Sequence, residues 1–466
     1  MNSNNLTLAV YGIQDLSDDP WPAYVHDHNL ALYDNGNLVK YLALERHTRN
    51  KYDSRLPSYI YSLLKQENLL GISNLDLVFV DNVIGRAFIS REGNIRFEAP
   101  MNEGLSEMPE KGRGYLLDRP VEAYVVNHEL AHIFSCLPFY GPFKENSLHV
   151  HFDGGASKSN FSAWMFRNGR LRLLEYHWDL NYLASFFNAN ALAFSLVKAS
   201  QENQNSMPGK FMGYAAYGNY DGRIESWLKK HDYFKDIWGN KKLFFERVRK
   251  DWNISLKSFD QNNSFLQNIA ASFQHIFQRE LLDKMKELKQ STGAEYLYYS
   301  GGSALNIKAN AALVNRGIFR EVFVPPCTND SGLSIGAGAF VEWLKHGYVQ
   351  PQSPFLNNWL LNLPEINYSE ADLKTVSELL FKGGIIAVMN GYGEAGPRAL
   401  GNRSIIARAD SKKLSNYVSQ KLKQREWYRP VAPVMLEKHL PYFTGSPSPG
   451  SLSQFMLTEF HIQPGR

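Results

Sequence analysis

The chain has few of the features that would anchor it in a membrane or prepare it for export. Only 2 of its 466 residues are cysteine, too few for a disulfide framework, which favours a reducing compartment. No window approaches the ~20 apolar residues that a membrane span needs, and the start, MNSNNLTLAVYG, shows no basic leader followed by an apolar run. The 50 Lys and Arg residues nearly balance 46 Asp and Glu residues, and a net charge of +4 is too small to indicate nucleic acid as the main partner. We therefore expect a cytoplasmic globular protein.

The composition is that of a folded chain with a large interior. Hydrophobic residues make up 44% and charged residues 21%, which excludes wholesale disorder. A length of 466 residues suggests two or three domains that can bury a core without disulfides.

One pattern of secondary structure is predicted twice within residues 1–350. In each copy a buried strand precedes a hairpin, whose turn (residues 34–37, then Asn168-Gly169) tolerates positive φ. We interpret the copies as a duplicated α/β unit whose turns face each other across a cleft and hold phosphates. The alternative is chance resemblance, because hairpins with Asn-Gly turns are common. The first copy comprises residues 6–12 and 28–45, and the second residues 147–155 and 161–177.

The other segments alternate between helical and extended patterns. Further strands are expected at residues 75–82, 124–126, 296–300, 321–325 and 384–390, and helices at residues 46–66, from 127 onward, over most of 196–290 (above all 264–288) and at 370–382. A polar, proline-bearing segment at residues 351–367 predicts a linker. Residues 394–407 predict a basic loop, and the last residues predict a strand.

The sharpest local signal is the segment NHELAH at residues 127–132. His128 and His132 share one face of a helix for which Asn127 is a good N-cap, so both rings can face one metal ion. The same residues match the His-Glu-x-x-His motif of zinc peptidases, in which Glu129 would activate a water. A third interpretation is two histidines in a polar cleft.

Two carboxylates favour a metal site of another kind. Asp153 follows the strand in LHVHFDGG, and Asp330 lies in the turn TNDSG, whereas no downstream helix offers an obvious third ligand for a peptidase zinc. Two imidazoles and two carboxylates suit Fe(II), Mn(II) or Zn(II), with open positions for a substrate oxygen. Each aspartate alone is more often a turn or cap residue, so the prediction depends on the set of four.

Three further sets predict contacts to anions. Gly301-Gly302 lets backbone amides approach a nucleotide at a helix N-terminus. Lys210, between glycines in PGKFMG, can hold a phosphate or belong to a solvated loop. A dense basic set near the C-terminus suits a small, highly charged anion, because guanidinium groups bind phosphate bidentately, and its alternative is a nucleic-acid or solvated face. This set comprises Arg398, Arg403, Lys421, Lys423, Arg425 and Arg429.

Taken in order, these segments resemble the NodU/CmcH family of O-carbamoyltransferases over nearly the whole chain. So many motifs in the same order are highly specific. They are LER at residues 44–46, NHxxAH at 127–132, GKxMGxAAYG at 209–218, GGxALN at 301–306, GPRALGNRS at 396–404 and RExxRPxAP at 425–433.

The resemblance implies an α/β protein in two parts. Residues 1–350 would form a duplicated actin/Hsp70 ATPase-like domain similar to the tRNA-modification enzyme TsaD, residues 351–367 a linker, and residues 368–466 a partial YrdC-like domain. In this family the YrdC-like part makes carbamoyladenylate from carbamoyl phosphate and ATP. The first domain then passes the carbamoyl group to a hydroxyl of a small molecule, often an antibiotic or another natural product. The implied cofactors are ATP with Mg²⁺ and a divalent metal, foremost Fe(II), and no nucleic acid or membrane partner is implied.

The resemblance also implies roles for individual residues. Independently of the resemblance, the chemistry of the transfer calls for a base, which we expect at a histidine outside the ligand set, His26 or His28. The family's metal ligands match His128, His132, Asp153 and Asp330, its nucleotide-binding positions match Lys210, Gly301, Gly302, Asn306 and Asp330, and its carbamoyl-phosphate-handling set matches Arg398, Lys423, Arg425 and Arg429.

The chain departs from the family pattern at two places. Glu129 stands where the family usually has another histidine, which we expect to alter the surroundings of the ligands rather than the ligands themselves. A His-x-Asp-Gly-Thr-like segment and a Leu-Asn-Thr-Ser-Phe-Asn-like motif do not occur before Arg466. We therefore expect either a fragment of a longer chain or a natural loss, with adenylate formation impaired in both cases. The other function hypotheses are a zinc metallopeptidase and a nucleotide-binding scaffold with a degenerate C-terminal half.

Overall fold

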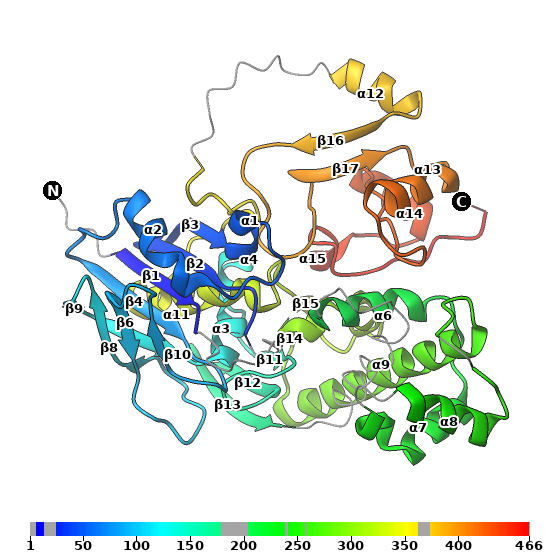
Figure 1. Cartoon of the computed structure of the whole chain (residues 1–466), viewed down its shortest axis with the longest axis horizontal. Coiled ribbons are helices and arrows are strands. Elements are labelled where there is room, and N and C mark those ends of the chain that lie inside the picture. Colours follow the sequence, from blue (N-terminus) through cyan, green and yellow to red (C-terminus); the bar gives the residue numbers. More distant parts are fainter. Residues whose placement is uncertain are drawn as a thin grey trace.

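Two β-sheets of the same design form the centre of the molecule (Figure 1). The computed structural model describes residues 6–13, 25–178, 204–237, 241–256, 259–361 and 373–465. In spatial order, the first sheet consists of β3 (Asn37–Ala43), β2 (Asn29–Asp34), β1 (Leu6–Tyr11), β4 (Leu75–Val80), β10 (Ala123–Val126) and β7 (Glu110–Lys111). The second consists of β13 (Arg170–His177), β12 (Phe161–Arg167), β11 (Ser147–Phe152), β14 (Tyr296–Ser300) and β15 (Glu321–Phe323).

The strand order confirms the predicted duplication. In the first sheet β1 pairs antiparallel with β2, β2 antiparallel with β3, and β1, β4 and β10 run parallel. In the second sheet β11, β12 and β13 repeat the antiparallel part, and β11, β14 and β15 repeat the parallel part. This repeated order is that of the actin/Hsp70 ATPase fold, with β7 added at the edge of the first sheet. The hairpin turns lie where the sequence places them, with positive φ at Asn35, Gly36, Asn168 and Gly169.

Helices cover the sheets and form a lobe beside the second sheet, where the long helix α9 lies (Figure 1). Short helices follow β3, and α3 and α11 follow the last parallel strand of each sheet. In the first half the helices are α1 (Leu44–Thr48), η1 (Leu56–Ser58), α2 (Ile60–Gln66), α3 (His128–Phe134) and α4 (Leu137–Tyr140). In the second half they are η3 (Gln204–Ser206), α6 (Met207–Ala215), α7 (Gly222–Lys230), η4 (Asp232–Ile237), α8 (Lys241–Trp252), α9 (Ser264–Thr292), η5 (Gly302–Leu305), α10 (Ile307–Asn315), η6 (Asp330–Gly332) and α11 (Leu333–His346).

A close crossing of α3 and α11 joins the two halves. The small residues of α11 allow this approach, because a Cβ atom at Gly336 would lie 1.7 Å from the carbonyl oxygen of Ala131. Two residues further along, on the side of α11 that faces the first sheet, a Cβ at Gly338 would meet the ring of Tyr33 at 2.4 Å. Phe134 and Phe340 stack across the crossing with ring centroids 3.9 Å apart. The crossing therefore fixes the position of α3, the helix that carries both motif histidines.

Two smaller units complete the chain. A four-stranded antiparallel sheet, inserted between β4 and β10, consists of β5 (Ala87–Ile89), β6 (Ile95–Glu98), β8 (Arg113–Leu116) and β9 (Arg119–Val121). The C-terminal segment contains α12 (Leu373–Phe381), the antiparallel pair β16 (Ile385–Met389) and β17 (Arg403–Ala407), α13 (Lys412–Asn416), a π-helical turn at Tyr417–Leu422, η8 (Glu437–His439), α14 (Leu440–Thr444) and α15 (Gly450–Ser453).

The C-terminal segment is attached to both halves of the first part. Leu452, Phe455 and Leu457 are buried in the same apolar cluster as the core of the second half, and Asn310 Nδ2 donates to the carbonyl oxygen of Leu457 at 2.9 Å. On the other side, Arg46 Nη2 donates to the Gly396 carbonyl oxygen at 3.4 Å. These contacts hold the predicted basic set against the first part.

Three local predictions were wrong. The helix expected over residues 46–66 is not continuous. It stops at Thr48 and resumes as η1 and α2, because Arg49 and Tyr52 have positive φ and the Asp53 carboxylate holds the intervening loop by accepting hydrogen bonds from Thr48 and Arg55. Residues 403–407, expected in a loop, form β17 through pairing with β16. The expected final strand is absent from the described residues up to 465, where a short helix, α15, precedes irregular chain.

Other parts of the sequence-based description lie outside the described residues or agree with them. The structure does not describe residues 196–203 and 370–372, where helices were expected, or residues 362–367, which were expected in the linker. Both cysteines, Cys136 and Cys327, are buried and free. None of the described helices combines the length and the apolar character that crossing a bilayer requires.

Replacing Gly336 with alanine should destabilise the protein by about 3 kcal/mol, because the new methyl group must displace a backbone carbonyl rather than a flexible side chain. The measurement is the free energy of unfolding from chemical denaturation. Gly71 is a matched control, since a Cβ there meets nothing within 4 Å. If both alanine variants unfold alike, the crossing does not limit stability.

Candidate active site

The two motif histidines lie on the first turns of α3, next to the end of β10. Asn127 caps the helix as predicted, and its Oδ1 accepts a hydrogen bond from the Leu130 amide at 2.8 Å. His128 and His132 are fully buried, and their Nε2 atoms lie 3.0 Å apart. The rings therefore point to one place, as the four-residue spacing predicts.

Both predicted aspartates lie at this place. Asp153 follows β11, and its Oδ2 is 3.2 Å from His132 Nε2. Asp330 lies in the turn between β15 and α11, and its Oδ1 is 3.5 Å from His132 Nε2 and 3.6 Å from His128 Nε2. One donor atom from each of the four residues lies within 4.8 Å of the others, and no second group of this kind occurs among the described residues.

The donor atoms have the chemistry and the spacing of a metal site. Two donors that are each about 2.1 Å from an ion lie about 3.0 Å apart at right angles and about 3.4 Å apart at tetrahedral angles. The separations of 3.0–3.6 Å fall in this range. A divalent cation would also balance the two carboxylates. These four residues can thus hold one ion.

The carboxylates control the charge of the cluster. Burial lowers the pKa of His132, but hydrogen bonds to Asp153 and Asp330 outweigh burial and raise the pKa to about 9. For Asp330, burial raises the pKa, yet the charges of His26 and His128 hold it well below its usual range. His151 stacks on His132 with centroids 5.2 Å apart, and burial keeps its pKa well below the ordinary value.

The two candidate bases have different surroundings. His26 is one-fifth exposed, and its Nδ1 lies 3.0 Å from Asp27 Oδ2 and 3.8 Å from Asp330 Oδ2. Burial lowers the pKa of His26, but Asp330 and Asp27 raise it to about 9, so this ring is charged at neutral pH unless a cation offsets Asp330. His28 is fully buried, and burial lowers its pKa to about 3. Only His26 reaches the cluster.

The predicted nucleotide-binding turn lies beside the same cluster. Gly301 has φ +97°, and a Cβ there would lie 2.3 Å from the Phe152 carbonyl oxygen, so this position requires glycine. The Gly302 amide donates to Asp153 Oδ2 at 2.6 Å and thereby orients that carboxylate. Asn306 caps α10 and pairs with Gln274 at 3.1 Å. A nucleotide-binding role for these residues stays a prediction.

Lys210 lies on α6 and is almost completely buried. Its Nζ is 2.6 Å from Glu426 Oε1, which belongs to the C-terminal segment. For Glu426, burial raises the pKa, but the hydrogen bond from Lys210 lowers it below the usual value. This ion pair places the predicted phosphate-binding lysine next to the predicted basic set.

Four members of the basic set form one group of mutually repelling charges: Arg398, Lys423, Arg425 and Arg429. Burial lowers the pKa of Arg398, and the charges of Arg429 and Arg425 lower it further. The same three causes lower the pKa of Lys423, namely burial, Arg425 and Arg429. Arg398 Nη2 also donates to the Leu305 carbonyl oxygen at 3.2 Å, which places this group next to η5. Such a group favours a multiply charged anion.

A carboxylate and a tyrosine connect the basic set with the rest of the site. Glu394 Oε1 accepts the amides of Leu400 and Arg403 at 3.0 Å, so it shapes the loop that carries Arg398. Burial raises the pKa of Tyr52, and the charge of Arg429 acts in the opposite direction; the Tyr52 ring centroid lies 6.2 Å from that of His26. The basic set therefore lies on the side of the metal cluster where His26 lies.

Comparison with known proteins gives the chain its family. The family model "Carbamoyltransferase N-terminus" matches residues 110–339, and "Carbamoyltransferase C-terminus" matches residues 377–466. The chain belongs to the carbamoyltransferase family. The protein is therefore a transferase, as the resemblance of its motifs implies.

Nodulation proteins are similar to this chain over most of its length. Nodulation protein U of Azorhizobium caulinodans is 26% identical over 94% of this chain and 83% of its own length. Nodulation protein NolNO of Sinorhizobium fredii is 24% identical over 94% of this chain and 66% of its own length. A crystal structure of full-length HypF in its phosphate- and nucleotide-bound form aligns with 74% of this chain and 47% of HypF, at 12% identity and a TM-score of 0.33. The fold assignment rests on the strand order described above.

Several residues of the transferase's site carry no sequence motif. Tyr11 Oη donates to Asp330 Oδ2 at 2.9 Å, and Asn29 Nδ2 donates to the Asp330 carbonyl oxygen at 2.8 Å. Glu129, expected near the ligands, turns its carboxylate to the loop at residues 157–159. Strand periodicity marks Tyr11 and Asn29 only as strand residues, so their contacts with Asp330, more than 300 residues away, had no local signal.

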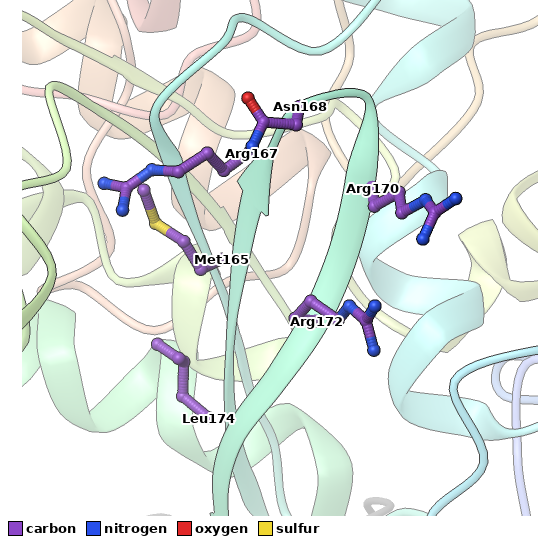
Figure 2. A pocket seen from close by; sticks show the side chains of 6 residues that line it. All are labelled: Met165, Arg167, Asn168, Arg170, Arg172 and Leu174. Carbon is purple, nitrogen blue, oxygen red and sulfur yellow. The ribbon is translucent and has the colours of Figure 1, made fainter.

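A surface hollow on the β12–β13 hairpin is separate from this site. None of the predicted site residues lines it, and Arg167 there is bonded to Asn146 Oδ1 and the Thr292 carbonyl oxygen. Figure 2 shows its lining residues, Met165, Arg167, Asn168, Arg170, Arg172 and Leu174.

Replacing Arg425 with leucine should have opposite effects on stability and on anion binding. Removal of one of several repelling cations should raise the melting temperature in chloride buffer. It should also abolish most of the additional stabilisation that inorganic phosphate gives the wild type. The measurement is thermal unfolding in phosphate and chloride at equal ionic strength. Arg91→Leu, at an exposed turn before β6, is the control, and equal phosphate stabilisation of Arg425→Leu and wild type would refute an anion site here.

Proposed function

We propose that this transferase moves a carbamoyl group from carbamoyl phosphate, by way of carbamoyladenylate made with ATP, to a hydroxyl group of a small-molecule natural product. The observation that carries the proposal is the convergence of His128, His132, Asp153 and Asp330 on one buried point beside a glycine turn. Family membership supports carbamoyl transfer, and the geometry supports its chemistry.

The proposed cation is Fe(II), with Mn(II) and Zn(II) as alternatives, and Mg²⁺ accompanies ATP. A donor set of two imidazoles and two carboxylates suits these ions and leaves positions for substrate oxygens. Bound there, the cation would polarise the carbamoyl carbonyl and lower the pKa of the acceptor hydroxyl. His128, His132, Asp153 and Asp330 would hold it.

Each part of the chain would perform one step. We assign adenylate formation to residues 368–466, which would have a partial YrdC-like fold, transfer to residues 1–350, and a linker role to residues 351–367. Arg398, Lys423, Arg425 and Arg429 would bind carbamoyl phosphate, and Lys210, Gly301, Gly302, Asn306 and Asp330 would bind the nucleotide. The positively charged arginine and lysine side chains would neutralise the phosphates and stabilise the negative charge on the leaving group.

The reaction balances with water as a co-reactant. Carbamoyl phosphate, ATP and water give carbamoyladenylate, phosphate and pyrophosphate. In the transfer step the acceptor oxygen bonds to the carbamoyl carbon, the bond from that carbon to the AMP phosphate oxygen breaks, and AMP leaves. The hydroxyl proton passes to a base, for which His26 is placed better than His28. When His26 Nδ1 donates to Asp27, the lone pair is on Nε2 and can accept that proton.

The zinc-peptidase alternative has no support in the geometry. Its mechanism needs the Glu129 carboxylate to activate a water at the metal. That carboxylate instead accepts hydrogen bonds from the amides of Ser157 and Lys158 and from the Ser159 hydroxyl. The scaffold alternative predicts nucleotide binding without turnover.

Because adenylate formation by residues 1–466 alone is expected to be impaired, the proposal is tested on the full-length protein, supplied with ATP, carbamoyl phosphate, Mg²⁺, Fe(II) and a panel of hydroxylated acceptors. We expect release of pyrophosphate, measured by a coupled assay, and the addition of one carbamoyl group per acceptor, measured by mass spectrometry. His132→Ala should lose transfer because the cation site is broken, while pyrophosphate release continues. If neither pyrophosphate release nor carbamoyl transfer occurs with any acceptor of the panel, the result would favour the scaffold alternative.

The choice of base can be tested by comparing the two histidines. His26→Gln should slow transfer by roughly 10²–10⁴-fold at an unchanged rate of pyrophosphate release. His28→Gln should lower stability instead, because His28 Nδ1 accepts a hydrogen bond from the Leu56 amide in the interior. Equal loss of transfer in the two variants would rule out His26 as the base.

A further inference from the structure

We propose that Glu129 is a positioning residue for the cation site, acting through the loop that follows Asp153. The inference rests on the proposed cation-binding function and adds a residue outside the ligand set. Glu129 lies between the two histidines on α3, is fully buried, and does not point at the cluster.

The Glu129 carboxylate accepts three hydrogen bonds from three consecutive loop residues. Its Oε1 accepts from the Lys158 amide at 2.8 Å and from the Ser159 hydroxyl at 3.0 Å, and its Oε2 accepts from the Ser157 amide at 3.3 Å. Hydrogen bonds to a charged acceptor are stronger than those between neutral groups. The carboxylate therefore holds the tip of this loop firmly to α3.

The other end of the loop carries the ligand Asp153. The Asp153 amide donates to the Asn160 carbonyl oxygen at 2.9 Å, and the Ala156 amide donates to the Ser159 carbonyl oxygen at 2.9 Å. The loop is thus a closed unit whose base is the Asp153 backbone and whose tip is held by Glu129. A shift of the tip would move the Asp153 carboxylate relative to His132, which lies one turn from Glu129 on the same helix.

A second carboxylate, Asp81, attaches the same loop to the first sheet. Its Oδ1 accepts from the Ser157 hydroxyl and, at 3.3 Å, from the His128 amide. The Ser157 Oγ also accepts from the His128 amide at 2.8 Å. The end of β4, the start of α3 and the loop after β11 thereby share one hydrogen-bonded junction, and Glu129 supplies most of its contacts to the loop.

The contacts of Glu129 differ from those of an ordinary structural carboxylate in what they hold. All three hydrogen bonds come from the loop that begins at the ligand candidate Asp153. Glu129 itself lies on α3 between the other two ligand candidates, His128 and His132. Removing a residue that orients metal ligands typically lowers metal affinity by 10- to 100-fold. We therefore expect Glu129 to affect cation affinity more than a carboxylate of equal burial elsewhere.

Glu342 offers the matched control. It also lies on a helix, α11, is fully buried, and accepts a hydroxyl and an amide, from Thr7 Oγ1 and Gly36 N, each at 2.6 Å. Its partners lie on β1, in the turn between β2 and β3, and on α11 itself, and none of them belongs to the cluster. Glu342→Gln should therefore cost stability without changing cation affinity.

In the experiment, the wild type, Glu129→Gln and Glu342→Gln are titrated with Co²⁺. Binding is monitored by visible absorption and by calorimetry. In Glu129→Gln the amide group must face at least one loop N–H, so we expect a 10- to 100-fold weaker Co²⁺ affinity and an altered absorption spectrum. Glu342→Gln should bind Co²⁺ as wild type does.

A milder variant covers the case in which Glu129→Gln does not fold. Ser159→Ala removes one of the three contacts and should weaken Co²⁺ binding severalfold. Wild-type affinity and spectrum in the folded Glu129 variant, or in Ser159→Ala if the former is unfolded, would overturn the inference. Failure of the wild type to bind Co²⁺ would instead overturn the proposed cation site itself.

Discussion

The site depends on the attachment of one segment, residues 328–335, to the sheet of the opposite half. Tyr11 and Asn29 bind Asp330 directly, through its carboxylate and its carbonyl oxygen. Tyr33 and Tyr41 bind the carbonyl oxygens of Ile335 and Ser331 at 2.7 and 2.6 Å. Each of these donors is buried, so breaking one leaves an unpaired polar group in the interior, which is costly. This attachment carries Asp330 from the second half to the histidines of the first.

The four ligand candidates bring opposite charges into the interior at a point where both sheets end. An isolated carboxylate is expensive to bury, and two near each other are more so. The Gly302 amide and the Tyr11 hydroxyl compensate part of this cost, and the two imidazoles more of it. A divalent ion would balance both carboxylates and let both imidazoles stay neutral. The same features that make the cluster unfavourable when empty therefore favour the binding of a divalent cation.

The C-terminal segment contributes the opposite electrostatic element. Burial lowers the pKa of Arg398 and of Arg425, and the charge of Arg429 lowers both further, a cost that an anion would offset. The segment is anchored in the core of the second half through Leu457 and its neighbours, and it contacts the first half at Gly396. A cluster that could hold a cation and a group of like-charged basic side chains thus lie in one molecule. This arrangement suits a reaction in which a phosphorylated donor meets a metal-activated acceptor.

Local patterns in the sequence determined the duplicated hairpins, the N-cap at Asn127 and the common face of His128 and His132, because these depend on residues close together in the chain. They also identified Asp153 and Asp330 as candidates, although each by itself is a common turn residue. They failed for residues 46–66 and for β17, where loop contacts and strand pairing overrode local propensity. Only the tertiary structure decided that the four donor atoms meet, that His26 rather than His28 reaches them, and that Glu129 faces a loop. These outcomes depend on contacts between residues up to 319 apart, such as Tyr11 with Asp330, for which no spacing rule exists.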